Sequence, residues 1–210
     1  MMTDVINPLE VLTVGHSNRS IDEFLTVLRA NHVTAIADVR STPFSRMYPH
    51  FDRTSLSESL RAQGIVYSFL GFELGGRPRD LAIYEKGRAA YKRIAETDTF
   101  QQGIQRVLRG ARQYRLALLC SEKDPLECHR GLLIAPQLER NGAAIAHILD
   151  SASVEKHNQT VERLLARFGL DQQQLFVGSN SSVIEEAYAR QEHRVAYSLK
   201  RHSEDIRVGG

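Results

Sequence analysis

The stretch Leu116–Gly131, LALLCSEKDPLECHRG, decides the fold, because it combines a buried strand with a helix start and holds both cysteines of the chain. Residues 116–120 are an uninterrupted apolar run of strand length, which is typical of a strand covered on both faces. Asp124, Pro125 and Glu127 then predict a helix start, in which Asp124 is the N-cap, Pro125 is the first helical residue and Glu127 completes a capping box.

Three reactive side chains follow that helix start. Cys128, His129 and Arg130 are expected on the first turns of a helix that covers residues 125–140. Unpaired backbone N–H groups and the positive end of the helix dipole favour an anion or a thiolate there. Pro136 should kink or shorten the helix, because proline cannot donate a backbone hydrogen bond. The segment is predicted to form one wall of a site.

Strands and helices alternate through the rest of the chain. Strands are predicted at residues 10–14, 34–40, 65–70, 116–120 and 143–149. Helices are predicted at residues 20–29, 55–63, 87–97, 100–114, 125–140, 154–168 and 184–194. This alternation predicts an α/β fold, a three-layer α/β/α domain with a mostly parallel sheet of about five strands. We place this domain at residues 1–150 and a helical C-terminal extension at residues 151–210, with a polar bridge at 172–174 and a frayed end from residue 201.

Composition is that of a soluble globular protein. Of the 210 residues, 42% are hydrophobic and 25% are charged, and no apolar run approaches the roughly 20 residues that span a bilayer. Two cysteines are too few for a disulfide framework and, with no secretory signal at the start, indicate a reducing compartment. The net charge of +2 is too small to attract nucleic acid in bulk. We expect a cytoplasmic protein without a membrane partner, and the sequence does not specify its oligomeric state.

Polar groups follow four of the predicted strands. They are His16 and Ser17, residues 38–40, the Gly-Gly-Arg run at residues 75–77, and residues 120–123. In parallel α/β sheets, ligands bind beyond the carboxyl ends of the strands. We therefore expect these groups to share one rim.

Together these motifs resemble the bacterial and archaeal family called domain of unknown function 488. The resemblance rests on Gly15-His16-Ser17, Asp38-Val39-Arg40-Ser41-Thr42-Pro43, Leu74-Gly75-Gly76-Arg77, and residues 119–125 with Cys128-His129-Arg130. It covers about residues 11 to 150, and it is specific because several motifs occur in the same order. It implies a fold and the location of a site but no activity, since the name of the family assigns none. The family-like positions are His16, Ser17, Asp38, Arg40, Cys120, Glu122, Lys123, Cys128, His129 and Arg130.

The first candidate chemistry is general acid–base catalysis. Asp38 and Glu122 end neighbouring or near-neighbouring strands, and His16 lies on another loop of the same rim. A carboxylate pair, or a histidine–carboxylate pair, can move protons at a reacting bond. The cations expected to hold an anionic substrate are Arg40, Arg77 and Arg130, with Lys123 as a point charge. The alternative is that the Asp38–Arg40 and Glu122–Arg130 pairs are structural and fix loops.

Cysteine chemistry offers two further alternatives. Cys128 beside His129 and Arg130 has the surroundings that lower a thiol pKa and create a nucleophile. No arginine completes a Cys-x5-Arg anion loop after Cys120, which is itself expected in the core. The cysteines, His129 and His16 could hold zinc, but the seven-residue gap between the cysteines is not a usual short spacing. We therefore predict no metal and no cofactor, and keep Cys128 as a reserve nucleophile.

The loop at residues 44–51 adds an aromatic group to the rim. Tyr48, near Arg46 and His50, could stack on a base. Ser17, Arg46, Tyr48 and His129 complete the predicted substrate-binding set. The sequence thus predicts a hydrolase or transferase that acts by acid–base catalysis. Its expected substrate is an anionic, nucleotide-like small molecule or a nucleic acid. The alternative is a non-catalytic nucleic-acid-binding or regulatory module that uses the same basic loops.

Overall fold

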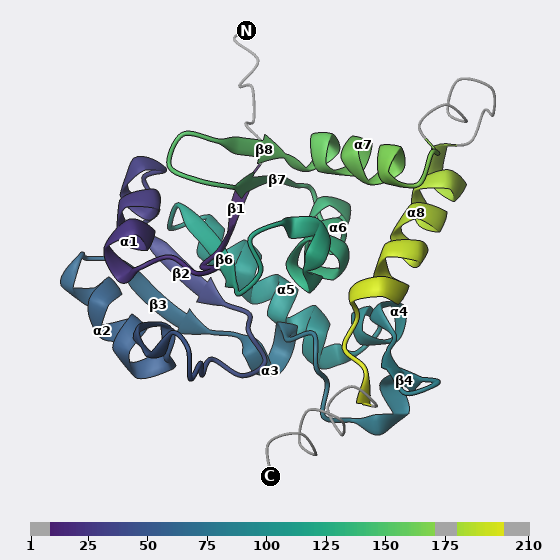
Figure 1. Cartoon of the computed structure of the whole chain (residues 1–210), viewed down its shortest axis with the longest axis horizontal. Coiled ribbons are helices and arrows are strands. Elements are labelled where there is room, and N and C mark those ends of the chain that lie inside the picture. The colour runs from purple at the N-terminus through teal and green to yellow at the C-terminus, as the bar shows by residue number, and fades with distance from the viewer. Residues whose placement is uncertain (1–8, 171–179, 200–210) are drawn as a thin grey trace, which may run out of the picture.

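The centre of the fold is a six-stranded sheet with the strand order β3-β2-β6-β1-β7-β8 (Figure 1). The computed structural model describes residues 9–170 and 180–199. The strands of the sheet are β1 (Leu9–Gly15), β2 (Ala35–Asp38), β3 (Val66–Phe69), β6 (Leu116–Cys120), β7 (Ala143–Ile148) and β8 (Val154–Lys156). The first five are parallel, and β8 pairs antiparallel with β7 at one edge. The predicted α/β fold with a mostly parallel sheet is confirmed.

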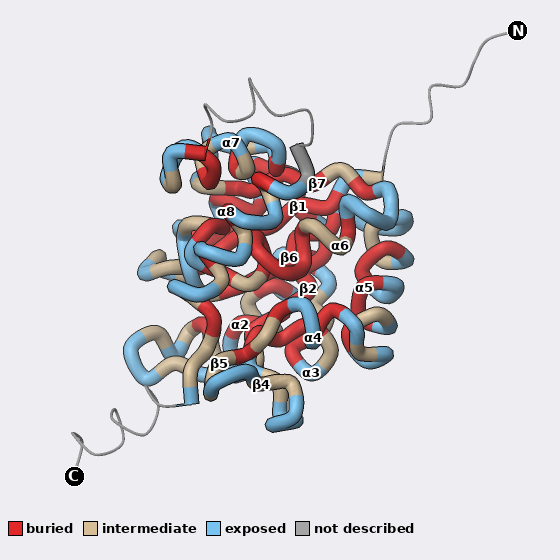
Figure 2. Tube along the Cα trace, turned by 90° about the vertical axis from the view of Figure 1, so that its right-hand side faces the viewer, coloured by how far each residue is buried: buried red, intermediate tan, exposed pale blue. Residues whose placement is uncertain are grey.

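Helices cover both faces of the sheet, as the two hydrophobic cores show. One core contains α1 (Ile21–Ala30), α2 (Arg53–Ala62) and the 3-10 turn η1 (Pro49–Phe51). The other core contains α3 (Gly71–Leu74), α4 (Tyr91–Ala95), α5 (Asp98–Ala111), α6 (Ala135–Arg140), α7 (His157–Arg167) and α8 (Asn180–Val195). A short 3-10 turn, η2 (Leu81–Ile83), precedes a small hairpin. Figure 2 shows the central strands buried between these two layers.

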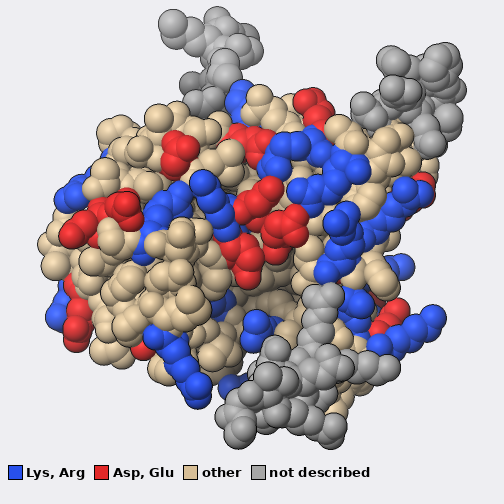
Figure 3. Space-filling model, viewed as in Figure 1, with Lys and Arg blue, Asp and Glu red and all other residues tan. Residues whose placement is uncertain are grey.

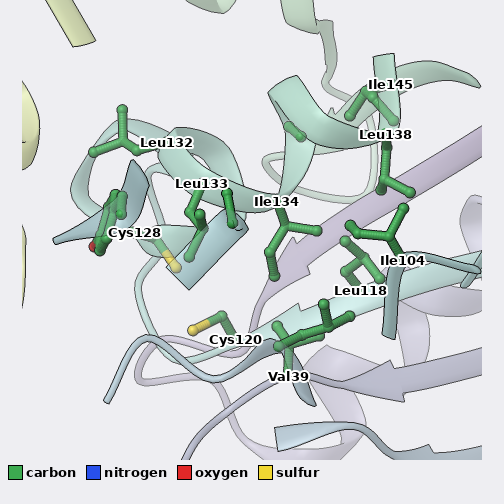
Figure 4. Packing of buried hydrophobic residues seen from close by; sticks show 14 of the residues in the cluster. Val39, Ile104, Leu118, Cys120, Cys128, Leu132, Leu133, Ile134, Leu138 and Ile145 are labelled. Atoms are coloured by element: carbon green, nitrogen blue, oxygen red, sulfur yellow. The ribbon is translucent and has the colours of Figure 1, made fainter. Parts of the chain in front are cut away.

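Strand alternation decides which core each side chain enters. Ala117 and Leu119 of β6 belong to the core with α1 and α2, whereas Leu118 and Cys120 belong to the other core. Successive side chains of a strand point to opposite faces, so this division follows directly from the extended backbone. Cys120 therefore ends β6 on the face covered by α5 and α6, as the packing in Figure 4 shows.

Local capping interactions explain where α1 begins and where α2 ends. Ser20 accepts a hydrogen bond from the backbone N–H of Glu23, whose side chain reaches back to the Ser20 backbone. These two bonds satisfy donors that the helix itself leaves unpaired. Gly64 follows α2 with a φ of 70°, a left-handed conformation that glycine adopts without strain.

The single helix predicted at residues 125–140 is wrong. The chain instead forms a 3-10 turn, η3 (Pro125–Glu127), then an extended Cys128, a π-helical turn, η4 (Arg130–Ile134), and finally α6. A Cβ at Gly131 would lie 2.2 Å from the carbonyl oxygen of Pro125, so this compact fold-back requires glycine. Pro136 lies in the first turn of α6, where its missing N–H breaks no helical bond.

Two other predicted helices begin later than expected. Residues 84–89 form a hairpin of β4 (Tyr84–Glu85) and β5 (Arg88–Ala89), so the helix predicted from residue 87 starts at Tyr91. Both turn residues, Lys86 and Gly87, have positive φ values of 50° and 77°, as a type I′ turn requires. The helix predicted from residue 154 starts at His157, because β8 occupies the preceding residues.

Residues past 150 contribute to the sheet and to the core. β8 extends the sheet, and α7 and α8 bury side chains in the same core as α5 and α6. The boundary at residue 150 stays a prediction, and the predicted polar bridge at 172–174 and frayed end from 201 lie outside the described residues. Within the described parts of the chain, no helix combines the length and apolar character that crossing a membrane requires.

Candidate functional site

Two adjoining cavities lie beyond the carboxyl ends of β1, β2 and β6. The larger has a volume of about 780 Å³ and the smaller about 430 Å³. Both are lined by Arg40, Thr42, Phe44, Ser121 and Glu122, so they lie side by side along the rim and share a wall. Ligands of parallel α/β sheets bind at this end. The predicted residues that line one or both cavities are His16, Ser17, Arg40, Tyr48, Arg77, Glu122, Cys128 and His129.

The larger cavity contains both cysteines. Cys120 ends β6, Cys128 follows η3, and Figure 4 shows that their sulfur atoms approach one another from these two segments. The Nδ1 atom of His129 lies 3.7 Å from the Cys120 sulfur and 3.8 Å from the Cys128 sulfur. The two sulfurs and this nitrogen all lie within 4.8 Å of one another. The gap between the two cysteines in the sequence is longer than the usual spacing of zinc ligands, yet the three side chains form one compact cluster.

The two thiols differ in pKa because they are buried side by side. A hydrogen bond to Cys128 and then burial raise the pKa of Cys120 well above its usual value. Burial alone would also raise the pKa of Cys128. The hydrogen bond from Cys120 and the positive charges of Arg130 and His129 outweigh burial and lower the pKa of Cys128 well below its usual value. Of the two thiols, Cys128 therefore has the surroundings that favour a thiolate.

His129 is held in one orientation by backbone groups. Its Nε2 atom lies 3.1 Å from the carbonyl oxygen of Val39. A carbonyl only accepts, so Nε2 carries a proton and Nδ1 is the nitrogen that faces the sulfurs. A Cβ at Gly76 would lie 2.9 Å from Cγ of the imidazole, so the Gly76 backbone packs against the ring. Gly76 belongs to the Gly-Gly-Arg run at residues 75–77, and this close approach explains why glycine is needed there.

Glu122 separates the cysteine cluster from the smaller cavity. The Cys120 thiol donates a hydrogen bond to its Oε2 atom at 3.1 Å. The side chain is exposed, but the protein around it removes part of its hydration. This desolvation, followed by the negative charge of Cys128, raises the pKa of Glu122. A carboxyl group in such surroundings can accept and return a proton.

Arg130 does not reach the rim, where it was predicted to bind an anion. Its side chain is fully buried and lines neither cavity. Its guanidinium donates to the carbonyl oxygens of Glu122 and Lys123 at 2.6 and 2.8 Å, and to Thr13 Oγ1 at 3.3 Å. The predicted Glu122–Arg130 contact is therefore made through the Glu122 backbone, and its role is to fix the loop after β6. At Gly15 a Cβ would lie 1.8 Å from the Glu122 carbonyl oxygen, so β1 approaches this loop closely.

Asp38 is likewise unsuited to the catalytic role predicted for it. Its carboxylate is fully buried and accepts hydrogen bonds from Arg40 Nε and Nη2 at 2.9 and 2.6 Å. Tyr67 and the backbone N–H of Arg40 donate two more bonds, at 2.8 and 3.1 Å, and Asp38 lines neither cavity. Arg40 also donates to the Phe51 carbonyl, so its three guanidinium nitrogens are all occupied. The structural alternative for the Asp38–Arg40 pair matches this geometry.

Strand register explains why Asp38 and Glu122 are not a catalytic pair. Asp38 is in register with Leu119, whose side chain enters the core with α1 and α2. Registered neighbours on parallel strands point to the same face, so Asp38 points to that side of the sheet. Cys120 is one residue further along and points to the opposite side.

The smaller cavity contains His16, Ser17 and Tyr48. His16 stacks on Phe51 with 4.2 Å between the ring centroids, and its Nδ1 atom lies 2.8 Å from the Ser17 carbonyl oxygen. Burial lowers the pKa of His16 to about 4. The imidazole is thus neutral at physiological pH, with Nδ1 as the protonated nitrogen and Nε2 as an acceptor. Ser17 has a φ of 54°, a conformation that is uncommon outside glycine and marks the turn after β1.

The remaining predicted cations differ in position. Arg77 lines the larger cavity, and its guanidinium lies over the Tyr197 ring at 4.8 Å from the centroid. Arg46 and Lys123 are exposed and line neither cavity. Arg77 is therefore the exposed cation best placed for an anion in the larger cavity.

Two other cavity residues have no signal in the sequence that marks them as part of a site. Tyr91 is buried at the start of α4 and lines the larger cavity, although its spacing indicates only an apolar helix face. Tyr197 follows α8 and reaches the same cavity from a part of the chain interpreted as an appendage. Both contacts depend on tertiary packing between segments distant in sequence.

Comparison with known proteins identifies one family model that matches the chain. The family model described as Domain of unknown function DUF488 matches residues 20–135. A comparison with curated proteins and one with solved structures each found no match. The matched span includes Asp38, Glu122 and both cysteines, whereas His16 precedes it.

Proposed function

The chain belongs to the family described as Domain of unknown function DUF488, and from its strand-end cavities we propose that it is a hydrolase or transferase of an anionic, nucleotide-like substrate. One observation carries this proposal. The Glu122 carboxyl group forms part of the wall shared by both cavities, next to the Cys120 thiol at 3.1 Å. A substrate bound across the two cavities would contact a proton-transfer group at its centre.

The dimensions and the lining suit a small charged molecule. A volume of about 780 Å³ lies within the usual range of ligand pockets, roughly 300–1,000 Å³. Arg77 supplies an exposed positive charge in the larger cavity. Tyr48 and Phe44 supply aromatic surface in the smaller cavity, where a base could stack. An anionic group near Arg77 and a ring near Tyr48 would place the bond between them beside Glu122.

Glu122 is the proposed general base and acid. It takes the proton from an attacking hydroxyl group, which belongs to water in a hydrolase or to an acceptor in a transferase. The attacking oxygen forms a bond to the substrate centre as the bond to the leaving atom breaks, and Glu122 returns the proton to that atom. His16 contributes a neutral imidazole that can accept a hydrogen bond from the substrate.

Substrate discovery followed by matched variants tests the proposal. The protein is incubated with mixed phosphoesters, nucleosides and nucleotides, and products are followed by mass spectrometry. Glu122→Gln should abolish turnover while binding persists, and Arg77→Ala should weaken binding. Glu127→Gln is the matched control, because Glu127 lines the same cavity but pairs with Arg167. Full activity in Glu122→Gln would contradict the assignment.

The nucleic-acid-binding alternative predicts a different outcome. It requires binding that weakens steeply with salt, with no turnover and no effect of Glu122→Gln. Figure 3 shows Lys and Arg lying among Asp and Glu on the viewed face, rather than forming a continuous basic surface. Cavities of the size of a small molecule beside Glu122 favour the enzyme.

A further inference from the structure

The cluster of Cys120, Cys128 and His129 has the donor atoms of a metal centre. Two sulfurs and one imidazole nitrogen lie within 4.8 Å of one another, and both cysteines are buried. In a tetrahedral zinc site, bonds of about 2.3 Å to sulfur and 2.0–2.1 Å to nitrogen place sulfur and nitrogen roughly 3.6 Å apart. The observed distances of 3.7 and 3.8 Å from Nδ1 to the sulfurs match this geometry.

The surroundings of His129 are those of a metal ligand. Metal-binding histidines usually donate their second ring N–H to a carbonyl or carboxylate, which fixes the tautomer and the ring orientation. Here the Val39 carbonyl accepts from Nε2 at 3.1 Å, so Nδ1 is the nitrogen that faces the two sulfurs and is available to a metal once it is deprotonated. Gly76 packs against the ring and leaves no room for a Cβ. The imidazole is therefore oriented before any ligand arrives.

Cys128 is oriented as well. It has an extended backbone between η3 and η4, with φ −143° and ψ 143°. The backbone N–H of Arg130 donates to its sulfur at 3.4 Å. Backbone N–H groups support metal-bound thiolates in the same way that outer partners support histidine ligands.

We propose that Cys120, Cys128 and His129 bind one divalent, thiophilic cation of the zinc class. Two thiolates and a neutral imidazole suit zinc better than the oxygen-seeking calcium and magnesium ions. The dication would neutralise two sulfurs that the fold buries together. The predicted absence of a metal rested on the spacing of the cysteines, but this spacing rule describes short knuckles, whereas here β6 and η3 supply the two ligands.

The proposed centre has three protein ligands and an open side. Among the described residues, no fourth histidine, cysteine or carboxylate belongs to the group, and His16 lies outside it. All three ligands line the larger cavity, next to Glu122. Three-ligand zinc sites with an open position are catalytic rather than structural, because water or substrate completes the coordination. This catalytic role rests on the proposed function, whereas metal binding itself does not.

Metal content tests the site directly. The full chain is purified under reducing conditions without chelators, and its metals are measured by elemental mass spectrometry. About one zinc ion per chain is expected. Cys128→Ser and His129→Asn should lose most of it, and Gly76→Ala should lower metal affinity by about 10-fold to 100-fold through the displaced imidazole. Ser121→Ala, which changes a neighbouring cavity residue that is not a ligand, should retain it.

A metal titration of the wild-type protein tests the site even if the variants fail to fold. Metal-free wild-type protein is titrated with Co²⁺, and a thiolate-to-cobalt absorption band should grow to an end point near one ion per chain. Loss of this band in His129→Asn, with an unchanged circular dichroism spectrum, would support the site. Substoichiometric zinc together with no cobalt band in reduced wild-type protein would overturn it.

The outcomes for the metal and for catalysis can be told apart. Glu122→Gln should keep its metal and lose turnover. Bound metal without turnover on any substrate would leave the metal site standing and refute the proposed enzyme. Turnover in a protein that binds no metal would support the proposed enzyme and refute the metal site.

Discussion

A buried chain of hydrogen bonds should make the protein sensitive to acid. Thr13 Oγ1 lies 2.7 Å from His147 Nδ1, and His147 Nε2 lies 2.9 Å from His157 Nδ1. Tyr188 Oη then lies 2.9 Å from His157 Nε2, and Arg130 donates to Thr13 at the other end. Arginine only donates, so one consistent arrangement runs from Arg130 through Thr13 and both neutral imidazoles to Tyr188. Neither imidazole needs a positive charge in this arrangement.

The size of the acid effect follows from burial. Burial lowers the pKa of His157 from 6.5 to about 4, and burial with the His157 charge lowers that of His147 well below 6.5. Below pH 6.5 the unfolded chain binds protons that the folded chain cannot bind. Stability is therefore complete above about pH 6.5 and is lost as the pH falls towards 4. At 1.36 kcal/mol per pKa unit, His157 alone should reduce the free energy of unfolding by about 3 kcal/mol over this window.

Urea denaturation at pH 7.5 and pH 4.5 measures this effect. His157→Gln removes the titrating ring, so its free energy of unfolding should change between the two pH values by about 2.5 kcal/mol less than that of wild type. Tyr188→Phe is the control, because it removes a hydroxyl partner of His157 and keeps the ring. Its pH dependence should stay close to that of wild type. Contributions shared by all three proteins, such as acid release of a metal from Cys120 and Cys128, cancel in the comparison.

One result would refute this reasoning. If His157→Gln lost as much stability between pH 7.5 and pH 4.5 as wild type, the buried imidazole would not be the group that takes up the proton. An equal loss of pH dependence in Tyr188→Phe would instead assign the effect to the hydrogen bond. An unchanged pH dependence in His157→Gln would refute the burial of His157 as a neutral ring. A lost pH dependence in Tyr188→Phe would refute protonation of His157 as the cause.

Three substitutions should separate buried from exposed charges. Asp38→Asn should lower the free energy of unfolding by about 3–5 kcal/mol, because it leaves the buried Arg40 without its counter-charge; a loss below about 1 kcal/mol in urea denaturation would contradict this. Arg130→Met should lower it by about 2–5 kcal/mol in the same measurement, since two carbonyl oxygens lose their donor. Arg106→Ala breaks a partly exposed pair with Glu73 and should change thermal stability by less than about 1 kcal/mol.

Local sequence signals were sufficient for most of the fold. The apolar run of β6, the Ser20 capping box and the glycine after α2 each act within a few residues, so their structural effects could be predicted. The break at residues 128–134 could not be predicted, because it depends on Gly131 meeting the Pro125 carbonyl. The Lys86-Gly87 turn was a readable signal for the β4–β5 hairpin that the helical interpretation overlooked.

The site was predictable in position but not in detail. Strand ends identified the rim, and His16, Glu122 and Cys128 do line its cavities. The face to which each side chain points depends on strand pairing, which no single strand reveals. This is why Asp38 was paired with Glu122. The buried role of Arg130 was hidden for a similar reason, since its partners are backbone carbonyls that carry no sequence signal.

The sheet itself separates the groups that stabilise the fold from those proposed to react. Asp38 belongs to one face and Cys120 to the other, so a substitution on one face should leave the other intact. Asp38→Asn should therefore lower stability while the folded protein keeps its metal. His129→Asn should remove the metal with a smaller effect on stability in metal-free protein, because the backbone partner lost is one neutral carbonyl, that of Val39, rather than one member of a buried ion pair. If Asp38→Asn lost metal in step with His129→Asn, the two faces would be coupled, and Asp38 would have to be returned to the functional site.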